Sequence, residues 1–330
     1  MCKRKKWLLW WLLWCLLFSV TIFIGRIEQA QSQEKYPTKP IDIIVPFSPG
    51  GGVDLECRIV GSYLNKKWGV PMNVINKAGG NTVPANLEVY SAKPDGYTVF
   101  GDSLPSSSML GVVVKNLPFK VLDRTVVAIF AYAQSLLVVP SASPYKTLDD
   151  VIAAVKKDPG NFTWTSLGGA SSADYGVRQF FKAIGVDISK TKPVMAQGGA
   201  PAIGLVAGGH VILGCNTTSS VLPSFQAGMV RALGITGKNR HPSYPNVPTF
   251  EEIGYPDIDV AMWYGISGPP KLPSNIIERW DAALRGMLKE PEIVSQIDKV
   301  GGIPLYLNSA DAKKRITKEV EEVDKLWGLK

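Results

Sequence analysis

The chain of 330 residues is 45% hydrophobic and carries a formal net charge of +8. Five basic residues and one acidic residue fall within the first 32 positions, so the remainder carries +4, which is too mild for a nucleic-acid-binding protein. Because of this mild charge we expect no nucleic-acid partner. The remainder is roughly 300 residues long, more than one compact core usually holds, so we expect two domains.

Residues 1–32 have the order of a signal peptide. Residues 3–6 are all basic, and residues 7–24 are apolar apart from two hydroxyl side chains. The small residues of Ala30-Gln31-Ser32 predict cleavage before Gln33, and hence export. A retained membrane anchor is the alternative, because 18 apolar residues approach the shortest length that spans a bilayer.

After the signal segment, β-branched apolar runs alternate with amphipathic segments, which predicts an α/β fold. We predict strands at residues 41–46, 72–76, 98–101, 126–131, 136–139, 163–166, 211–214, 230–235 and 260–266. We predict helices at residues 53–68, 82–92, 147–158, 172–184, 200–207, 249–253, 274–289, 291–300 and 309–329. Thr147 and Ser309 stand ahead of acidic first turns, which predicts that each caps the helix that follows.

The first predicted strand runs into a glycine-rich turn, residues 47–52, and then into a helix. Glycines let the backbone approach a ligand, and the first N–H groups of a helix attract an anion. The spacing matches neither phosphate-binding fingerprint, so a nucleotide is not predicted. A plain tight turn is the alternative.

Two later segments repeat this device. Residues 162–166 form a predicted strand, and the small residues of 167–174 lead from it into a helix. Gln197-Gly198-Gly199-Ala200-Pro201 also enters a helix, although a plain turn is the alternative there. The recurrence predicts a cleft in which helix N-termini converge on one anion.

The chain lacks the sequence signals of an enzyme. Its two histidines, His210 and His241, are far apart, and it has neither a Gly-x-Ser-x-Gly elbow nor a metal-ligand spacing. We therefore predict no catalytic residue, no metal and no cofactor, and we expect His241 in an exposed polar loop. Cys57 and Cys215 are expected to be small buried side chains, with a single disulfide as the alternative.

The chain beyond residue 33 resembles the extracytoplasmic solute-binding proteins of tripartite tricarboxylate transporters, the Bug family. The motifs that carry this resemblance are residues 36–41 (Tyr-Pro-Thr-Lys-Pro-Ile), 46–54, 76–81 (Asn-Lys-Ala-Gly-Gly-Asn), 94–98, 248–254, 263–265 (Trp-Tyr-Gly) and 269–273. The resemblance implies a periplasmic-binding-protein fold, with two α/β domains, each a sheet flanked by helices, that close like a flytrap on a small carboxylate. It also implies a periplasmic monomer that hands its solute to the subunits of a membrane permease.

We expect one domain from residues 33–135 and 256–330, and the other from residues 136–255. Two alternative functions stay open at this point. The chain could be an exported hydrolase, or a solute-sensing binding protein without a dedicated permease.

By position, the resemblance implies ligand contacts in three loops and at one further residue. The first clamp is Phe47, Ser48, Gly50 and Gly51. The second clamp is Ser166, Gly168, Gly169, Ser171 and Ser172. The third loop is Gly198, Gly199 and Ala200, and the further contact is Ser103. For Ser171 and Ser172, helix capping is the alternative role.

Three departures from the family pattern concern the ligand. Asp174 stands where the family usually has a histidine, so it either receives a ligand amine or hydroxyl or only complements the helix dipole. Residues 210–212 lack a usual acidic residue, and residues 195–197 lack a usual aromatic one. Mono-, di- and tricarboxylates, aromatic carboxylates and amino acids all satisfy the first clamp.

Overall fold

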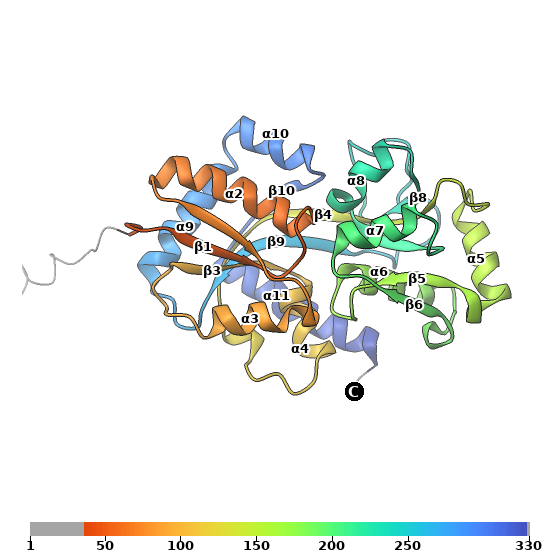
Figure 1. Ribbon diagram of the computed structural model, residues 1–330, viewed down its shortest axis with the longest axis horizontal. Helices are drawn as coiled ribbons and strands as arrows, with labels where there is room; N and C mark the ends of the chain where they lie inside the picture. Colours follow the sequence, from red (N-terminus) through yellow and green to blue (C-terminus); the bar gives the residue numbers. More distant parts are fainter. Residues whose placement is uncertain (1–35, 329–330) are drawn as a thin grey trace, which may run out of the picture. The chain divides into compact units, whose positions relative to one another are not determined.

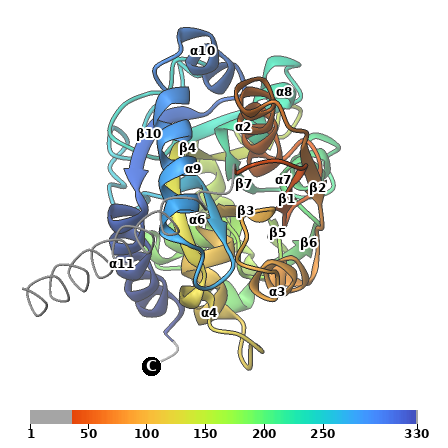
Figure 2. The same ribbon diagram turned by 90° about the vertical axis from the view of Figure 1, so that its left-hand side faces the viewer.

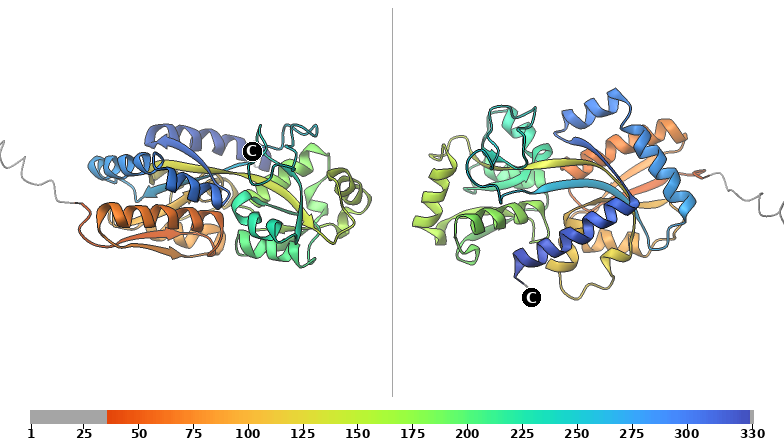
Figure 3. Two further views of the ribbon diagram at one scale, coloured as in Figure 1. Left: turned by 90° about the horizontal axis from the view of Figure 1, so that it is seen from above. Right: turned by 180° about the vertical axis from the view of Figure 1, so that it is seen from behind.

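The computed structural model describes residues 36–328, and the predicted signal segment lies outside the described residues. The compact unit that begins at Lys39 contains all the helices and strands described below. Its elements gather in two groups, and the strands β4 and β9 run between them (Figure 1 and Figure 3). We call the group of β1–β3, β10, α2–α4 and α9–α11 the first lobe, and the group of α5–α8 and β5–β8 the second lobe.

The bounds of the elements are as follows. The strands are β1 (Ile41–Val45), β2 (Met72–Asn76), β3 (Thr98–Ser103), β4 (Thr125–Pro140), β5 (Thr163–Ser166), β6 (Lys192–Met195), β7 (Gly214–Thr217), β8 (Val230–Ile235), β9 (Ala261–Gly268) and β10 (Ile303–Asn308). The helices are α2 (Gly52–Trp68), α3 (Val83–Tyr90), α4 (Leu110–Val113), α5 (Leu148–Lys157), α6 (Ser172–Ala183), α7 (Gly199–Ala207), α8 (Thr218–Gln226), α9 (Ser274–Met287), α10 (Pro291–Lys299) and α11 (Ser309–Trp327).

The sheet of the first lobe has the order β10-β4-β9-β3-β1-β2. β1 is parallel to both of its neighbours, β2 and β3, whereas β9 is antiparallel to β3 and β4. Four of the five β1 residues are buried, which explains its nearly continuous apolar sequence. α2 contacts β1, β2 and β3, and α11 contacts β4 and β10 (Figure 2). The glycine turn that follows β1 therefore places the first clamp at the carboxyl ends of the parallel strands β1, β2 and β3.

In the second lobe, β7 and β8 pair with the C-terminal half of β4, and β5 pairs in parallel with β6. Its core comes from residues 136–258 alone and includes the rings of Trp164, Phe180 and Phe181. The α/β fold class is confirmed. Among the described residues, none of the helices is long and apolar enough to cross a lipid bilayer.

The prediction of separate strands at 126–131 and 136–139 is wrong, because β4 is continuous. Two polar residues in its middle, Gln134 and Ser135, are buried inside the protein rather than exposed at a turn. Gln134 donates to the carbonyls of Thr236 and Asn239, and the Ser135 N–H donates to Thr236 Oγ1 at 2.8 Å.

Other boundaries also differ from the predictions. β7 lies three residues later than predicted, and α8, β6 and β10 were not predicted. The predicted helix at 249–253 is a series of turns that ends at Gly254, whose φ is +88°. Thr147 caps α5 as predicted, but Asn308 rather than Ser309 caps α11, since it accepts from the Asp311 N–H at 3.0 Å.

Both cysteines of the described chain are free and buried, so the alternative of a disulfide is not realised. The prediction of an exposed His241 is wrong: only 2% of the residue is exposed. Its Nδ1 accepts from the Ser243 N–H at 3.0 Å, and its ring lies edge-on to Tyr244. Burial lowers the pKa of His241. The charged neighbours in the sequence concealed this burial.

Candidate functional site

Four strand-to-helix junctions meet between the lobes, where β1, β5, β6 and β7 lead into α2, α6, α7 and α8. Residues from all four junctions line one small chamber of about 30 Å³, the inner chamber. Its lining is Phe47, Gly51, Gly52, Val53, Pro105, Leu167, Ser171, Ser172, Gly199, Asn216, Thr217, Ser220, Met262 and Tyr264. The first N–H groups of a helix have no partner within the helix, so these junctions concentrate positive potential here.

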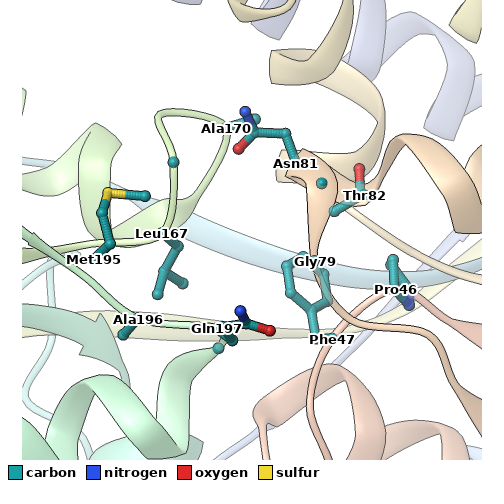
Figure 4. Close-up of a pocket in the computed structure, with 13 residues that line it drawn as sticks. Pro46, Phe47, Gly79, Asn81, Thr82, Leu167, Ala170, Met195, Ala196 and Gln197 are labelled. Carbon is teal, nitrogen blue, oxygen red and sulfur yellow. The ribbon is translucent and has the colours of Figure 1, made fainter.

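A larger chamber of about 340 Å³, the outer chamber, adjoins it (Figure 4). Its lining is Pro46, Phe47, Gly79, Gly80, Asn81, Thr82, Leu167, Gly168, Ala170, Met195, Ala196, Gln197 and Gly198. Phe47 and Leu167 line both chambers. The two chambers are therefore parts of one cleft, with these two side chains where they join.

No charged side chain lines either chamber within the part of the chain that the structure describes. A bound carboxylate would therefore meet backbone N–H groups, hydroxyls and amides. Hydrogen bonds from such donors to an anion are stronger than those between neutral groups, especially where water is excluded.

Two buried carboxylates shape the clamps from behind. In the first clamp, Asp54 accepts from the Gly50 N–H at 2.9 Å, from Asn76 Nδ2 at 2.8 Å and from Arg58 Nε at 3.1 Å. Burial alone would raise the pKa of Asp54, but the hydrogen bonds from Arg58, Gly50 and Asn76 outweigh it and lower the pKa. Gly50 has a φ of +78°, which favours glycine at this turn.

Asp174 has the equivalent position in the second clamp. Its carboxylate accepts from Ser166 Oγ at 2.5 Å, from the Leu167 N–H at 3.0 Å and from Ser171 Oγ. Ser171 in turn caps α6 by accepting from the Asp174 N–H at 3.0 Å. Asp174 is 2% exposed and lines neither chamber. In this arrangement the carboxylate holds the loop from residue 166 to residue 171 in place.

The structure brings most of the predicted site residues to the cleft. Those that line a chamber are Phe47, Gly51, Gly168, Ser171, Ser172, Gly198 and Gly199. Ser48 donates across the cleft to the carbonyl of Gln197, which joins the two lobes. Those that line no chamber are Gly50, Ser103, Ser166, Gly169, Asp174 and Ala200. Ser103 belongs instead to a buried network, in which its N–H donates to Asp102 at 2.8 Å.

Several lining residues were not predicted. Asn216, Thr217 and Ser220 come from the junction of β7 and α8, and Tyr264 comes from β9. A run of hydroxyl residues after an apolar strand was the available signal for that junction. Asn81 and Thr82 lie in a short turn after β2, and both have a positive φ. In the sequence, the glycine pair at residues 79–80 was the available signal that this turn reaches the cleft.

Two glycines of the inner chamber are in close contact with side chains from other elements. A Cβ at Gly52 would lie 2.3 Å from the Tyr264 hydroxyl, and a Cβ at Gly199 would lie 2.4 Å from Ser220 Oγ. Larger residues at these positions would force the lining apart. The close approach of α2 to β9, and of α7 to α8, therefore requires glycine at both helix starts.

Glu56, one turn into α2, is completely buried, and its carboxyl oxygens have no hydrogen-bond partner among the described residues. Burial, and secondarily the charge of Asp298, hold its pKa well above the ordinary value. The folded protein thus keeps a proton that the unfolded chain loses. Stability contributed by this neutral carboxyl is present at low pH and falls as the pH rises above the ordinary pKa of glutamate.

We expect the Glu56→Gln substitution to remove this pH dependence. The free energy of unfolding of the variant, relative to the unsubstituted protein, should rise by about 1.4 kcal/mol per pH unit while Glu56 stays protonated in the folded state. Urea unfolding at pH 5 and pH 8 measures it, with Glu321→Gln on the exposed face of α11 as the control for a lost charge. A difference that is the same at both pH values would contradict the assignment.

We expect Asp174→Ala to lower the free energy of unfolding by about 2–4 kcal/mol, because two buried hydroxyls and the part-buried Leu167 N–H lose their acceptor. Affinity for a solute should fall as well, since the second clamp loses its support. The control is Asp149→Ala, in the exposed first turn of α5, where loss of the dipole interaction costs about 0.3–1 kcal/mol. Equal losses of stability in the two variants would show that Asp174 only complements a helix dipole.

A family model described as the tripartite tricarboxylate transporter family receptor matches residues 57–327. The chain belongs to this family. The chain is similar to a UPF0065 protein of the tcbD-tcbE intergenic region in Pseudomonas sp. strain P51. That protein is 29% identical over 280 residues, which are 83% of this chain and 81% of the relative. Protein BugT of Bordetella pertussis is 28% identical over 306 residues, 92% and 93% of the two chains.

Several solved structures share the fold of this chain. A periplasmic transporter is 28% identical, with a TM-score of 0.83 over 89% of this chain and 97% of its own. MatC from Rhodopseudomonas palustris, solved with malate, is 23% identical, with a TM-score of 0.81 over 88% and 99% of the two chains. Rpa4515 from R. palustris, solved with adipate, is 23% identical, with a TM-score of 0.83 over 89% and 98%. The periplasmic-binding-protein fold is confirmed by the likeness to the periplasmic binding protein BugD, which is 22% identical, with a TM-score of 0.83 over 89% of this chain and 98% of its own.

Proposed function

We propose that this protein is an extracytoplasmic solute-binding protein that captures a small carboxylate in the cleft and delivers it to a tripartite tricarboxylate-type permease. The observation that carries the proposal is the inner chamber, where four helix N-termini meet without a charged side chain. A carboxylate is the common organic group that such a set of donors favours. Membership of the transporter receptor family supports the permease as the partner.

Solutes seen in structural relatives support the choice of a carboxylate. MatC was solved with malate and Rpa4515 with adipate, and both bind with the fold that this chain shares. We infer that the carboxylate contacts Gly51, Ser172 and Gly199 in this chain, together with Asn216 and Ser220. In this proposal Asp174 positions the second clamp and does not contact the solute.

We further propose that capture involves closure of two domains, formed by residues 33–135 with 256–330 and by residues 136–255. Separate hydrophobic cores in the two lobes, and the strands β4 and β9 between them, support this division. The hydrogen bond from Ser48 to the Gln197 carbonyl is of the kind that closure would form. Small-angle scattering should show a smaller radius of gyration once a binding carboxylate is added, and an unchanged curve would argue against closure.

In this proposal the protein acts in the periplasm as a monomer, after removal of residues 1–32. Mass measurement of the exported protein tests the cleavage before Gln33. Size-exclusion chromatography with light scattering tests the monomer.

A binding assay separates this function from the alternatives. We expect a carboxylate incubated with an equal amount of protein to be retained and recovered intact after denaturation. Conversion of the carboxylate would indicate a hydrolase or another enzyme. Cells that lack the protein should take up the bound carboxylate more slowly, and unchanged uptake would favour a solute sensor without a dedicated permease.

A further inference from the structure

The two chambers of the cleft differ in chemistry. The inner chamber is surrounded by helix starts and hydroxyls, as described above. The outer chamber has six apolar side chains, those of Pro46, Phe47, Leu167, Ala170, Met195 and Ala196. Figure 4 shows Phe47 and Leu167 on opposite sides of the chamber and Met195 beside Leu167. Met195 is 61% exposed in this structure. A methionine side chain makes chiefly apolar contacts, so Met195 adds apolar surface to the chamber.

The polar side chains of the outer chamber are all neutral, those of Asn81, Thr82 and Gln197. Thr82 precedes α3, but the Thr82 N–H donates to the Gly79 carbonyl at 3.1 Å, and the Val83 N–H donates to the Gly80 carbonyl. Pro84, the next residue, has no N–H at all. The first two positions of this helix therefore offer no unpaired N–H group to a solute in the outer chamber.

Asn81 brings a neutral amide, whose oxygen accepts and whose nitrogen donates hydrogen bonds. Its side-chain oxygen is buried and has no hydrogen-bond partner among residues 36–328. The Asn81 oxygen packs against Gly168 of the second clamp, and a Cβ at Gly168 would lie 2.4 Å from this oxygen. A carboxylate placed here would face this oxygen, whereas a hydroxyl could donate to it.

We propose that the solute is a carboxylate whose far end is uncharged and largely apolar, a hydrocarbon chain or ring with at most a hydroxyl. The carboxylate lies in the inner chamber, and the apolar body passes between Phe47 and Leu167 into the outer chamber. This inference rests on the proposed function, and it adds the class of solute. A second carboxylate would lose water in the outer chamber without gaining charged or helix-terminal donors, and binding would weaken.

Matched probes test the inference by calorimetry. Hexanoate and adipate share a six-carbon chain, and 3-phenylpropanoate and 3-(4-carboxyphenyl)propanoate share an aromatic one, so each pair differs in the far carboxylate alone. We expect the monocarboxylate of each pair to bind at least about tenfold more tightly, which corresponds to about 1.4 kcal/mol. Equal or tighter binding of both dicarboxylates would overturn the inference and leave the proposed function standing.

Hexan-1-ol, which has the chain without the carboxylate, separates the two levels of the proposal. We expect no measurable binding of the alcohol. If it binds as tightly as hexanoate, or if none of the four carboxylates binds, the anion site in the inner chamber is wrong and both proposals fail together.

A charge added to the outer chamber should reverse part of the preference. Met195→Lys places an ammonium group at an exposed position of that chamber. We expect the substitution to raise the affinity for adipate, relative to the affinity for hexanoate, by about threefold. Met229 is 51% exposed and lines neither chamber, so Met229→Lys is the matched control and should leave the ratio unchanged. The same change of ratio in both variants would show that net charge alone is responsible and would contradict the placement of the far end beside Met195.

Discussion

Replacing Gly51 with leucine is expected to abolish binding of a carboxylate while the protein still folds. Gly51 caps α2 with a φ of −77° and a ψ of 162°, a conformation that leucine adopts readily. A Cβ at this position would contact the Ser48 carbonyl at 3.3 Å and no other atom within 4 Å, so the side chain can enter the inner chamber. At least two hydrogen bonds to the anion, each of about 1.5–3 kcal/mol, would be lost, and affinity should fall by about 100-fold or more.

The control for this substitution is Gly204→Leu. Gly204 lies within α7 on the exposed face, and a Cβ there meets no atom within 4 Å. Leucine should stabilise this helix by about 0.5–1 kcal/mol and leave affinity unchanged. At Gly51, loss of the glycine cap should cost only about 1 kcal/mol of stability. Unchanged affinity of the folded Gly51→Leu protein would contradict the anion site.

Arg124→Met is expected to be the most destabilising single substitution among those considered, with a loss of about 3–5 kcal/mol. Arg124 and Asp102 form an ion pair at 3.2 Å, and each side chain is 1% exposed. Arg124 also donates to Ser267 Oγ at 2.6 Å and to Ser107 Oγ at 2.7 Å. Without the guanidinium, the buried charge of Asp102 loses its counter-charge.

Two further proteins separate the ion pair from general effects of the substitution. Arg240→Met breaks an ion pair of 2.9 Å in which both side chains are 44% exposed, and it should cost about 1 kcal/mol or less. The double substitution Asp102→Asn with Arg124→Met removes both buried charges and should recover part of the lost stability. Guanidinium unfolding measures all three proteins. Similar losses in Arg124→Met and Arg240→Met would contradict the burial argument.

Local patterns predicted much of the fold. β2, β5 and β8 have the predicted bounds, because each is a short run of strand-forming residues between turn signals. β4 could not be predicted as one strand, since the pairing of Gln134 with the Thr236 carbonyl is made across a long sequence separation. α8 was missed because Pro223 and a hydroxyl-rich start both favour a loop in a single sequence.

The candidate site was predictable where glycine marks a strand end, and less so elsewhere. The first two clamps lie across the cleft from each other as predicted, and their contact with a solute stays a prediction. Ser103 lines neither chamber because β3 continues to this residue, and its hydroxyl lies 3.1 Å from that of Ser106 in the buried network of Asp102. Tyr264 reaches the inner chamber from β9, and only the tertiary pairing of β9 with β3 and β4 brings it there.

The central claim is that the cleft retains a carboxylate solute through the inner chamber, and mass spectrometry of small molecules released by denaturation tests it most directly. Freshly purified protein and its Gly51→Leu variant would be washed, denatured and compared. We expect one carboxylate, close to one molecule per protein, in the unsubstituted protein and little or none in the variant. Equal amounts of the same carboxylate in both proteins, or a released solute without a carboxylate, would contradict the claim.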